Sequence, residues 1–175
     1  MKSTGVVRRI DELGRIVVPK EMRRVLHIHE GDSLEIKHND SEIVLKKYSL
    51  VESINYFVTQ YVDAVYASSK KEMIVTDDER ILAVSRGLPN AIVGKKISSD
   101  LASSLKTREP LIKEKGVNTE ICPGYTVTKP VIVKPISVYG DITGCVIVFG
   151  DNILTDVEKM LANLTSLFIG KYLEN

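Results

Sequence analysis

The small size of the N-terminal segment constrains the fold more than any other feature of the sequence. Four short stretches in residues 1–47 are rich in β-branched residues or alternate apolar and polar side chains, and this predicts β-strands. The segment contains no cysteine pair and no metal-ligand set that would stabilise it. A chain this short buries too little apolar surface by itself. We therefore expect two copies to share one core, with strands at residues 4–10, 15–18, 33–37 and 42–46.

A short helix is predicted between the second and third strands, from Pro19 to about Leu26. Proline suits the first turn of a helix, and Glu21 suits its positive end. The third and fourth strands are predicted to form a hairpin around Asn39 and Asp40. Alternation gives this hairpin one wet face and one dry face. The residues of the predicted dry face are Leu34, Ile36, Ile43 and Leu45.

The net charge of the chain is +1, but the charges are unevenly distributed. Residues 1–24 carry seven cations and three carboxylates, a net charge of +4. Residues 25–47 have a net charge of −2, and residues 48–175 have a net charge of −1. Five of the seven N-terminal cations are arginine, whose guanidinium binds phosphates and guanine edges in a fixed two-pronged geometry. The charge alone leaves two interpretations open, a nucleic-acid surface and a solvated basic face.

The period of the apolar pattern changes at Ser49. Ser49 and Glu52 are predicted to form a capping box at the start of a helix that runs to about Ala67. Apolar residues then recur at spacings of 3 and 4, as in a coiled-coil seam. The seam either joins helices of different subunits or packs on its own domain. Its residues are Val51, Ile54, Val58, Tyr61 and Val65.

The rest of the chain predicts an α+β domain with an antiparallel sheet. Ile142–Phe149 is almost entirely apolar and is predicted to be a central strand buried on both faces. Thr155–Glu158 is a second capping box, and it begins a terminal helix that ends near residue 173. Other strands are expected at residues 72–76, 81–85, 110–115 and 131–138, with a helix at 98–107 and an irregular stretch at 116–128. The apolar stripe of the terminal helix is expected to support oligomerisation through Val157, Leu161, Leu164 and Phe168.

The sequence contains no motif that predicts catalysis, a cofactor or a metal site. Phosphate-binding glycine loops, zinc-protease motifs and nucleophile elbows are all missing. His27 and His29 lack further metal ligands, and the Asp77–Glu79 cluster lacks the spaced oxygens of a calcium loop. Cys122 and Cys145 are expected to be buried thiols. No apolar run reaches the roughly 18 residues of a membrane helix and no leader is visible, so we expect a cytoplasmic protein. Because catalytic motifs are missing, we also expect that the protein is not an enzyme.

The N-terminal sequence resembles the signature of the AbrB-type transition-state regulators. Gly5, the Leu13–Arg15 turn, Pro19 and the Arg23–Arg24 pair all lie at the spacing of that family. The DNA-binding unit of the family is a swapped-hairpin β-barrel dimer, so the resemblance implies this fold and double-stranded DNA as a partner. It also implies the residues that contact DNA, which are Arg8, Arg9, Arg15, Arg23, Arg24 and Lys2.

The whole chain resembles a family of sporulation regulators that join an AbrB-type unit to a GAF-like domain. The resemblance implies domains at residues 1–50 and 51–175, and a homotetramer held together through the GAF-like domain. It implies a transcription factor that acts on sporulation genes in the forespore. GAF domains often bind small molecules, so Cys122 and Tyr125 would line such a pocket. The alternative is a GAF-like fold that serves oligomerisation alone.

An antitoxin-like autoregulator is the main alternative function. In that case the N-terminal unit would bind DNA and the C-terminal domain would bind a protein partner. Antitoxins usually end in a short disordered arm, whereas residues 48–175 carry two predicted capped helices and a predicted buried strand. The sequence therefore favours the transcription factor.

Overall fold

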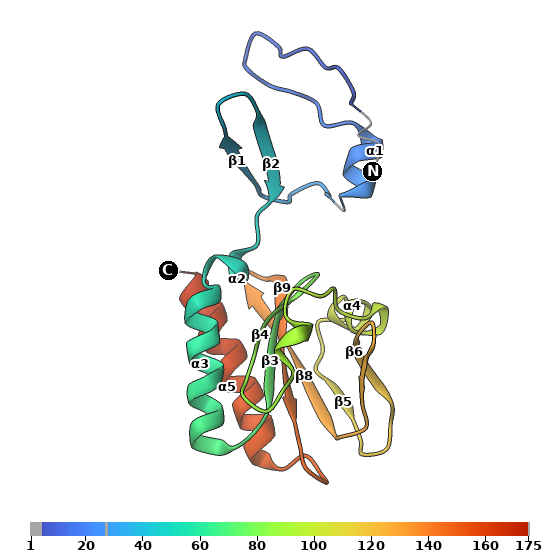
Figure 1. Cartoon of the computed structure of the whole chain (residues 1–175), viewed down its shortest axis with the longest axis vertical. Coiled ribbons are helices and arrows are strands. Elements are labelled where there is room, and N and C mark those ends of the chain that lie inside the picture. The colour runs from blue at the N-terminus through green and yellow to red at the C-terminus, as the bar shows by residue number, and fades with distance from the viewer. Residues whose placement is uncertain (1–4, 27, 175) are drawn as a thin grey trace. The chain divides into compact units, whose positions relative to one another are not determined.

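The computed structural model describes residues 5–26 and 28–174, and it divides the chain into two compact units, Met1–Tyr48 and Ser49–Asn175 (Figure 1). The second unit begins with a helix, because the Ser49 carbonyl oxygen accepts a hydrogen bond from the Ser53 amide at 3.2 Å. Each unit is described by itself below.

Residues 5–18 do not form the two strands that the sequence predicts. The described part of the segment contains a turn at residues 11–15 and has no strand pairing on either side of it. The predicted strands at 4–10 and 15–18 are therefore wrong for the single chain, and Thr4 lies outside the described residues. A strand needs a hydrogen-bonding neighbour, and the described part of one chain provides none for this segment.

Helix α1 spans Lys20–Val25, with Pro19 at its N-cap and Leu26 at its C-cap. This confirms the predicted helix. The Arg23 amide donates to the Pro19 carbonyl oxygen at 3.0 Å, so the proline supplies the first acceptor of the helix. Its missing N–H costs nothing there, because an N–H at the start of a helix has no acceptor within the helix. Pro19 is also the only buried residue among those that the structure describes in the first unit.

Strands β1 (Leu34–His38) and β2 (Ile43–Lys47) pair antiparallel, which confirms the predicted hairpin. The register places Ile36 opposite Leu45, so the four predicted residues do share one face. That face is not dry in the single chain, because Ile36 and Ile43 are each 70% exposed. The prediction of a buried face is wrong for one chain alone, since no described segment of the unit covers it.

The second unit is built around a five-stranded antiparallel sheet with the strand order β4-β3-β9-β8-β5. The central strand is β9, as predicted for the apolar run near the C-terminus. A two-residue turn at Tyr139–Gly140 joins β8 to β9. The strands are β3 (Met73–Asp77), β4 (Ile81–Val84), β5 (Leu111–Lys113), β8 (Val131–Val138) and β9 (Asp141–Phe149), and they confirm the predicted strand positions to within a few residues.

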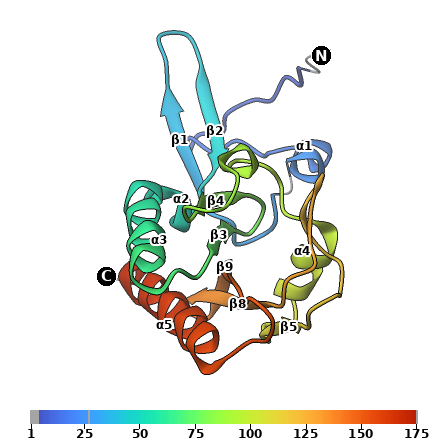
Figure 2. The ribbon, with the colours of Figure 1, turned by 60° about the horizontal axis from the view of Figure 1, so that its bottom comes forward.

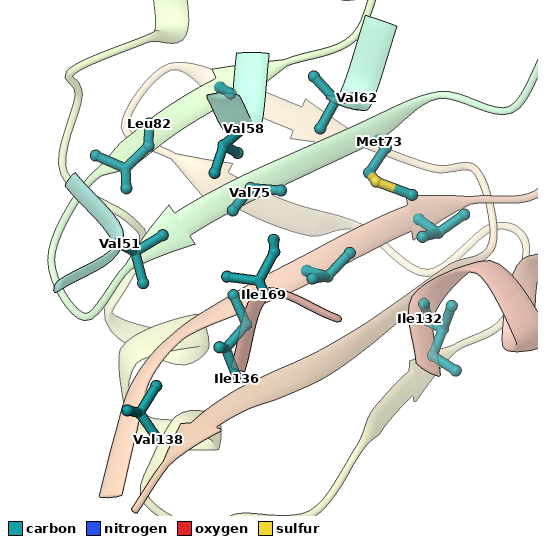
Figure 3. Close-up of a cluster of buried hydrophobic side chains, with 14 residues drawn as sticks. Val51, Val58, Val62, Met73, Val75, Leu82, Ile132, Ile136, Val138 and Ile169 are labelled. Atoms are coloured by element: carbon teal, nitrogen blue, oxygen red, sulfur yellow. The ribbon is translucent and has the colours of Figure 1, made fainter. Parts of the chain in front are cut away.

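Two helices cover one face of this sheet, α3 (Asn55–Ser69) and α5 (Asp156–Leu173), as Figures 1 and 2 both show. The core between them and the sheet is drawn in Figure 3. Side chains of the two helices meet alternate residues of the strands there, such as Val75 of β3. The fully buried residues of this core include Val51, Val58, Val62, Met73, Ile136 and Ile169.

The opposite face of the sheet is covered by smaller elements. These are a 3₁₀-helix (Asn90–Ile92), helix α4 (Ser99–Leu105) and a separate hairpin, β6 (Thr119–Cys122) with β7 (Tyr125–Val127). They enclose a second core with the remaining residues of β9. The expected helix near residues 98–107 is confirmed. The expected irregular stretch at 116–128 is wrong, because it contains the β6–β7 hairpin.

The predicted helix at 51–67 is divided into two. Helix α2 spans Leu50–Ser53, and α3 begins after Ile54, whose ψ of 20° departs from helical geometry. The Ser53 hydroxyl donates to the Leu50 carbonyl oxygen at 2.5 Å, a local bond that competes with continuation of the helix. The side chain of Glu52 lies outside the description, so the capping box predicted at Ser49–Glu52 stays a prediction.

The capping box at the start of α5 is confirmed. The Thr155 hydroxyl accepts from the Val157 amide at 3.3 Å, and the Glu158 carboxylate accepts from the Thr155 amide at 2.8 Å. Glu158 is also fully buried, and its Oε1 atom lies 2.8 Å from the Lys71 Nζ atom. The sequence predicted the cap but not this ion pair, which joins the start of α5 to Lys71, two residues before β3.

Candidate nucleic-acid interface

The turn at residues 11–15 of the predicted DNA-binding segment is held by backbone and side-chain hydrogen bonds. The Gly14 amide donates to the Asp11 carbonyl oxygen at 2.9 Å, and the Asp11 amide donates to the Arg15 carbonyl oxygen at 3.1 Å. Gly14 has a φ of 75°, the left-handed conformation that ends a three-residue hairpin loop. The Leu13-Gly14-Arg15 sequence therefore reverses the chain direction, as predicted for a hairpin.

The Asp11 side chain closes this turn with both of its oxygens. Oδ1 accepts from the amides of Leu13 at 3.0 Å and Arg15 at 2.8 Å, and Oδ2 accepts from the Arg15 Nε atom at 2.8 Å. The hydrogen bonds from the backbone and side chain of Arg15 lower the pKa of Asp11 below its ordinary value. The carboxylate is therefore charged at neutral pH. The sequence analysis did not single out Asp11 and missed this contact.

The remaining predicted arginines lie exposed on two separate segments. Arg8 and Arg9 precede the turn, and Arg23 and Arg24 lie on α1. Among the residues that the structure describes, none of these four makes an ion pair with a carboxylate. Their positive charge is thus fully available to an anionic partner. Lys2, the sixth predicted residue, lies outside the described residues, as does His27.

The residues predicted to form an oligomer seam in the first helix of the second unit mostly belong to its own core. Val51 and Val58 are fully buried, so they have no surface left for a second subunit. Ile54, Tyr61 and Val65 are half-buried against the same core. Val51 and Val58 thus pack on the core of their own domain, and a role of the seam in joining subunits stays a prediction. The physical reason for this packing is that α2 packs against β3 and α5, and α3 packs against β3 and β4, so that Val51 and Val58 lie in the core of this unit.

The terminal helix α5 differs, because it exposes an apolar face. Val157, Leu164 and Phe168 are between 41% and 54% exposed, whereas Leu161 is half-buried against the core. Phe168 also stacks on Tyr61 of α3 with ring centroids 5.4 Å apart. We call the exposed residues the α5 apolar face, and they are Val157, Met160, Leu164, Leu167 and Phe168.

The two residues predicted to line a ligand pocket lie on the β6–β7 hairpin. Cys122 is fully buried in the second core, and Tyr125 is half-buried against it. Burial raises the pKa of both side chains, so both are uncharged at neutral pH. A ligand at this position stays a prediction. The other thiol, Cys145, has a pKa raised to about 12 by burial, and both cysteines are free.

No group of three or more histidine, cysteine or acidic side chains is placed to hold a metal ion within residues 5–26 and 28–174. In the same residues, no helix combines the length and the apolar character that crossing a bilayer requires.

Comparison with known proteins matches each unit to a known family. Residues 53–174 match the family described as the stage V sporulation protein T C-terminal domain, a transcription factor, and residues 7–52 match the family of the bacterial antitoxin MazE. The chain is 35% identical to stage V sporulation protein T of Bacillus subtilis over 99% of both chains. It is also 62% identical to the transition state regulatory protein AbrB of the same species over 48 residues, which cover 27% of this chain and 50% of AbrB.

The second unit has a structural neighbour in the cofactor-binding GAF domain of the nutrient sensor CodY from Clostridium difficile. The TM-score is 0.50 and the identity 19%, and the alignment covers 66% of this chain and 83% of the CodY domain. An AbrB-type recognition unit followed by a GAF fold defines a class of two-domain transcription regulators. Within that class, the chain belongs to the stage V sporulation protein T family of transcription factors.

Proposed function

We propose that the protein regulates sporulation genes by binding their promoters through a dimer of its N-terminal units. The exposed arginines of a segment that is 62% identical to AbrB carry this proposal. Phosphate contacts supply most of the affinity of such complexes, and contacts to base edges supply the specificity. We assign Arg8, Arg9, Arg15, Arg23 and Arg24 to these two tasks together.

The proposal includes a dimer because one N-terminal unit leaves its apolar residues in water. Val7 is 93% exposed and Val17 is 76% exposed, in segments whose composition predicts strands. A second copy that supplies strand partners would satisfy the backbone of residues 5–18 and cover the exposed face of the β1–β2 hairpin. Two copies would also place two sets of arginines on one duplex.

We further propose that the GAF unit joins two such dimers into a homotetramer. The α5 apolar face supports this step, because contiguous exposed apolar side chains mark contact surfaces. Tethering raises the effective concentration of one DNA-binding dimer next to the other. The protein would then act on the nucleoid of the forespore by binding and not by catalysis.

Residues 7–52 also match the family of the bacterial antitoxin MazE, and this match is the observation that favours an antitoxin-like autoregulator as the second candidate function. The folded second unit, with its match to stage V sporulation protein T over residues 53–174, favours the transcription factor over an antitoxin-like autoregulator.

A gel-shift series on sporulation promoters tests the DNA-binding step. We expect Arg8→Ala, Arg15→Ala and Arg23→Ala each to weaken binding about fivefold or more, because each dimer loses two cationic contacts. Lys37→Ala is the matched control, since Lys37 is an exposed cation of the same unit that pairs with Glu35 at 3.0 Å. Thermal melting and dimerisation should be unchanged in all four variants. Equal weakening by Lys37→Ala would contradict the assignment of these arginines.

Light scattering at micromolar concentration tests the tetramer. We expect a tetramer for the wild type and a dimer for Leu164→Glu, because a carboxylate on the α5 apolar face cannot be desolvated without a partner. Asn163→Glu is the control, because residue 163 is exposed on the same helix but is not apolar. A wild-type dimer at this concentration would refute the tetramer.

A further inference from the structure

We propose that Asp11 is a positioning residue for DNA readout, which holds Arg15 by its Nε atom and so presents the terminal nitrogen atoms of the guanidinium to a base edge. The inference rests on the proposed function, in which Arg15 contacts DNA. It assigns a task to an acidic side chain in the most basic segment of the chain.

An acidic residue at this place carries an electrostatic cost when DNA binds. Residues 1–24 have a net charge of +4, and each carboxylate among them repels the phosphates of a bound duplex. A polar but uncharged residue such as asparagine would also form the turn, because it accepts the same backbone hydrogen bonds. The turn alone therefore does not explain why the residue is charged.

The geometry supplies a second task for the charge. Oδ1 takes the two backbone amides of the turn, and Oδ2 is left for the Arg15 Nε atom at 2.8 Å. The same carboxylate thus fixes the backbone of residue 15 and the direction of its side chain. Gly14 makes this possible, because its left-handed conformation brings Arg15 back beside Asp11.

The bond to Nε does not involve the two terminal nitrogen atoms of the Arg15 guanidinium. Arginine has five N–H donors, and two of the four on its terminal nitrogens can form the two-pronged contact with guanine O6 and N7. The Arg15 side chain is 72% exposed, so these donors remain accessible. A side chain held in advance loses less freedom on binding, and this improves affinity for the matching site by about two- to tenfold.

The charge state of Asp11 agrees with this role. The hydrogen bonds from Arg15 lower its pKa, so the carboxylate is ionised at neutral pH. Glu12 lies next to it in the same turn, and the structure records no contact between Glu12 and Arg15 among the described residues. The two neighbours therefore share charge and location and differ in the contact.

Asp11→Asn in the full chain separates positioning from turn formation and from charge. The asparagine carbonyl oxygen keeps the backbone hydrogen bonds, and its NH₂ group cannot accept from Nε. Glu12→Gln is the matched control, because it removes the same charge from the same turn. The probes are a duplex that the wild-type protein selects from a random pool and a shuffled duplex of the same length and composition.

We expect both variants to bind the shuffled duplex at least as tightly as the wild type, because each removes a negative charge. Only Asp11→Asn should lower the ratio of selected to shuffled affinity, by about two- to tenfold. In an Arg15→Ala background, Asp11→Asn should change this ratio no further. The inference is overturned if Asp11→Asn and Glu12→Gln have the same effect while Arg15→Ala still weakens binding. If Arg15→Ala leaves binding to every duplex unchanged, the proposed function itself fails at this residue.

A measurement on the free protein supports or contradicts the geometry independently. In ¹⁵N-resolved spectra of the wild type, the Arg15 Nε–H proton should exchange with water more slowly than that of Arg8, which has no ion pair among the described residues. Asp11→Asn should remove this protection, and Glu12→Gln should keep it. Equal exchange of the two arginines in the wild type would overturn the proposal.

Discussion

Replacing Lys71 by methionine should destabilise the second unit strongly, and by an amount that depends on pH. Glu158 is fully buried, and its partners are the Lys71 ammonium at 2.8 Å and the Thr155 amide at 2.8 Å. Burial alone would raise the pKa of Glu158, but the hydrogen bonds from Lys71 and Thr155 outweigh it and lower the pKa to about 2. Methionine keeps most of the side-chain volume and removes the charge.

The magnitude follows from the difference between the folded and unfolded states. A carboxyl whose pKa falls from 4.5 to about 2 on folding contributes about 3 kcal/mol to stability at neutral pH, at about 1.4 kcal/mol per pH unit. Because the folded pKa is the lower one, this contribution is complete above pH 4.5 and is lost as the pH falls towards 2. Loss of one partner of a buried pair costs about 3–5 kcal/mol at neutral pH, since the other charge remains buried.

In Lys71→Met the pH dependence of the contribution that Glu158 makes to stability reverses its sign. Burial now raises the pKa of Glu158, so the folded state takes up a proton more readily than the unfolded state. The difference in unfolding free energy between wild type and variant should therefore shrink by roughly 2 kcal/mol or more between pH 7 and pH 3. Below that pH the carboxyl of the variant is neutral, so only the loss of the hydrogen bond from Lys71 still destabilises the variant.

Urea unfolding followed by tyrosine absorbance, at fixed protein concentration, measures the unfolding free energies of wild type and variant. Six of the seven tyrosines lie in the second unit, so the signal reports on that unit. Lys159→Met is the control, because Lys159 is an exposed lysine 3.9 Å from Asp156, and such pairs contribute about 0–1 kcal/mol. A loss below about 1 kcal/mol for Lys71→Met, or an equal loss at pH 7 and pH 3, would refute the reasoning.

Three further outcomes are expected. DNA affinity should fall by a factor on the order of 10³ between about 50 and 200 mM salt if a dimer neutralises roughly six phosphates, and a filter-binding titration that shows no salt dependence would contradict this. Gly144→Ala should cost about 1–3 kcal/mol in urea unfolding, because the added Cβ would lie 2.1 Å from the Thr76 carbonyl oxygen, and an unchanged midpoint would disprove this contact. Ser166→Ala should cost about 1–3 kcal/mol in the same assay, since the buried Ser166 hydroxyl donates to the Pro135 carbonyl oxygen at 2.6 Å, whereas the exposed control Asn163→Ala should cost less than about 0.5 kcal/mol.

The sequence predicted the second unit well, because its signals are local. A continuous apolar run bounded by a turn identified β9 as the central strand, and the alternation before it placed β8 at residues 131–138. Thr155 and Glu158 located the start of α5 for the same reason, since a capping box is complete within four residues. The β6–β7 hairpin was missed because its two strands have only four and three residues and are separated by Pro123 and Gly124.

The errors in the first unit have a different origin. Residues 5–18 have the composition of strands, but strands require a neighbour, and the described part of a single chain does not supply one. The alternating pattern correctly placed Ile36 and Ile43 on one face of the hairpin. Whether this face is buried depends on a partner chain, and the pattern of one chain contains no information about that partner. The contact of Asp11 with Arg15 was missed because acidic residues in turns are common, and the side-chain bond depends on the conformation of Gly14.

The two units therefore differ in where their stability comes from. Apart from Pro19, every buried apolar side chain among the described residues belongs to the second unit, which encloses two cores of its own. The first unit carries the arginines and leaves most of its apolar residues exposed, so in the dimer that we propose its folding and its pairing are expected to be one event. Association through the second unit would hold two first units at high effective concentration and would reduce the entropic cost of that event. DNA affinity should consequently depend on protein concentration, even though the α5 apolar face contains none of the arginines assigned to DNA.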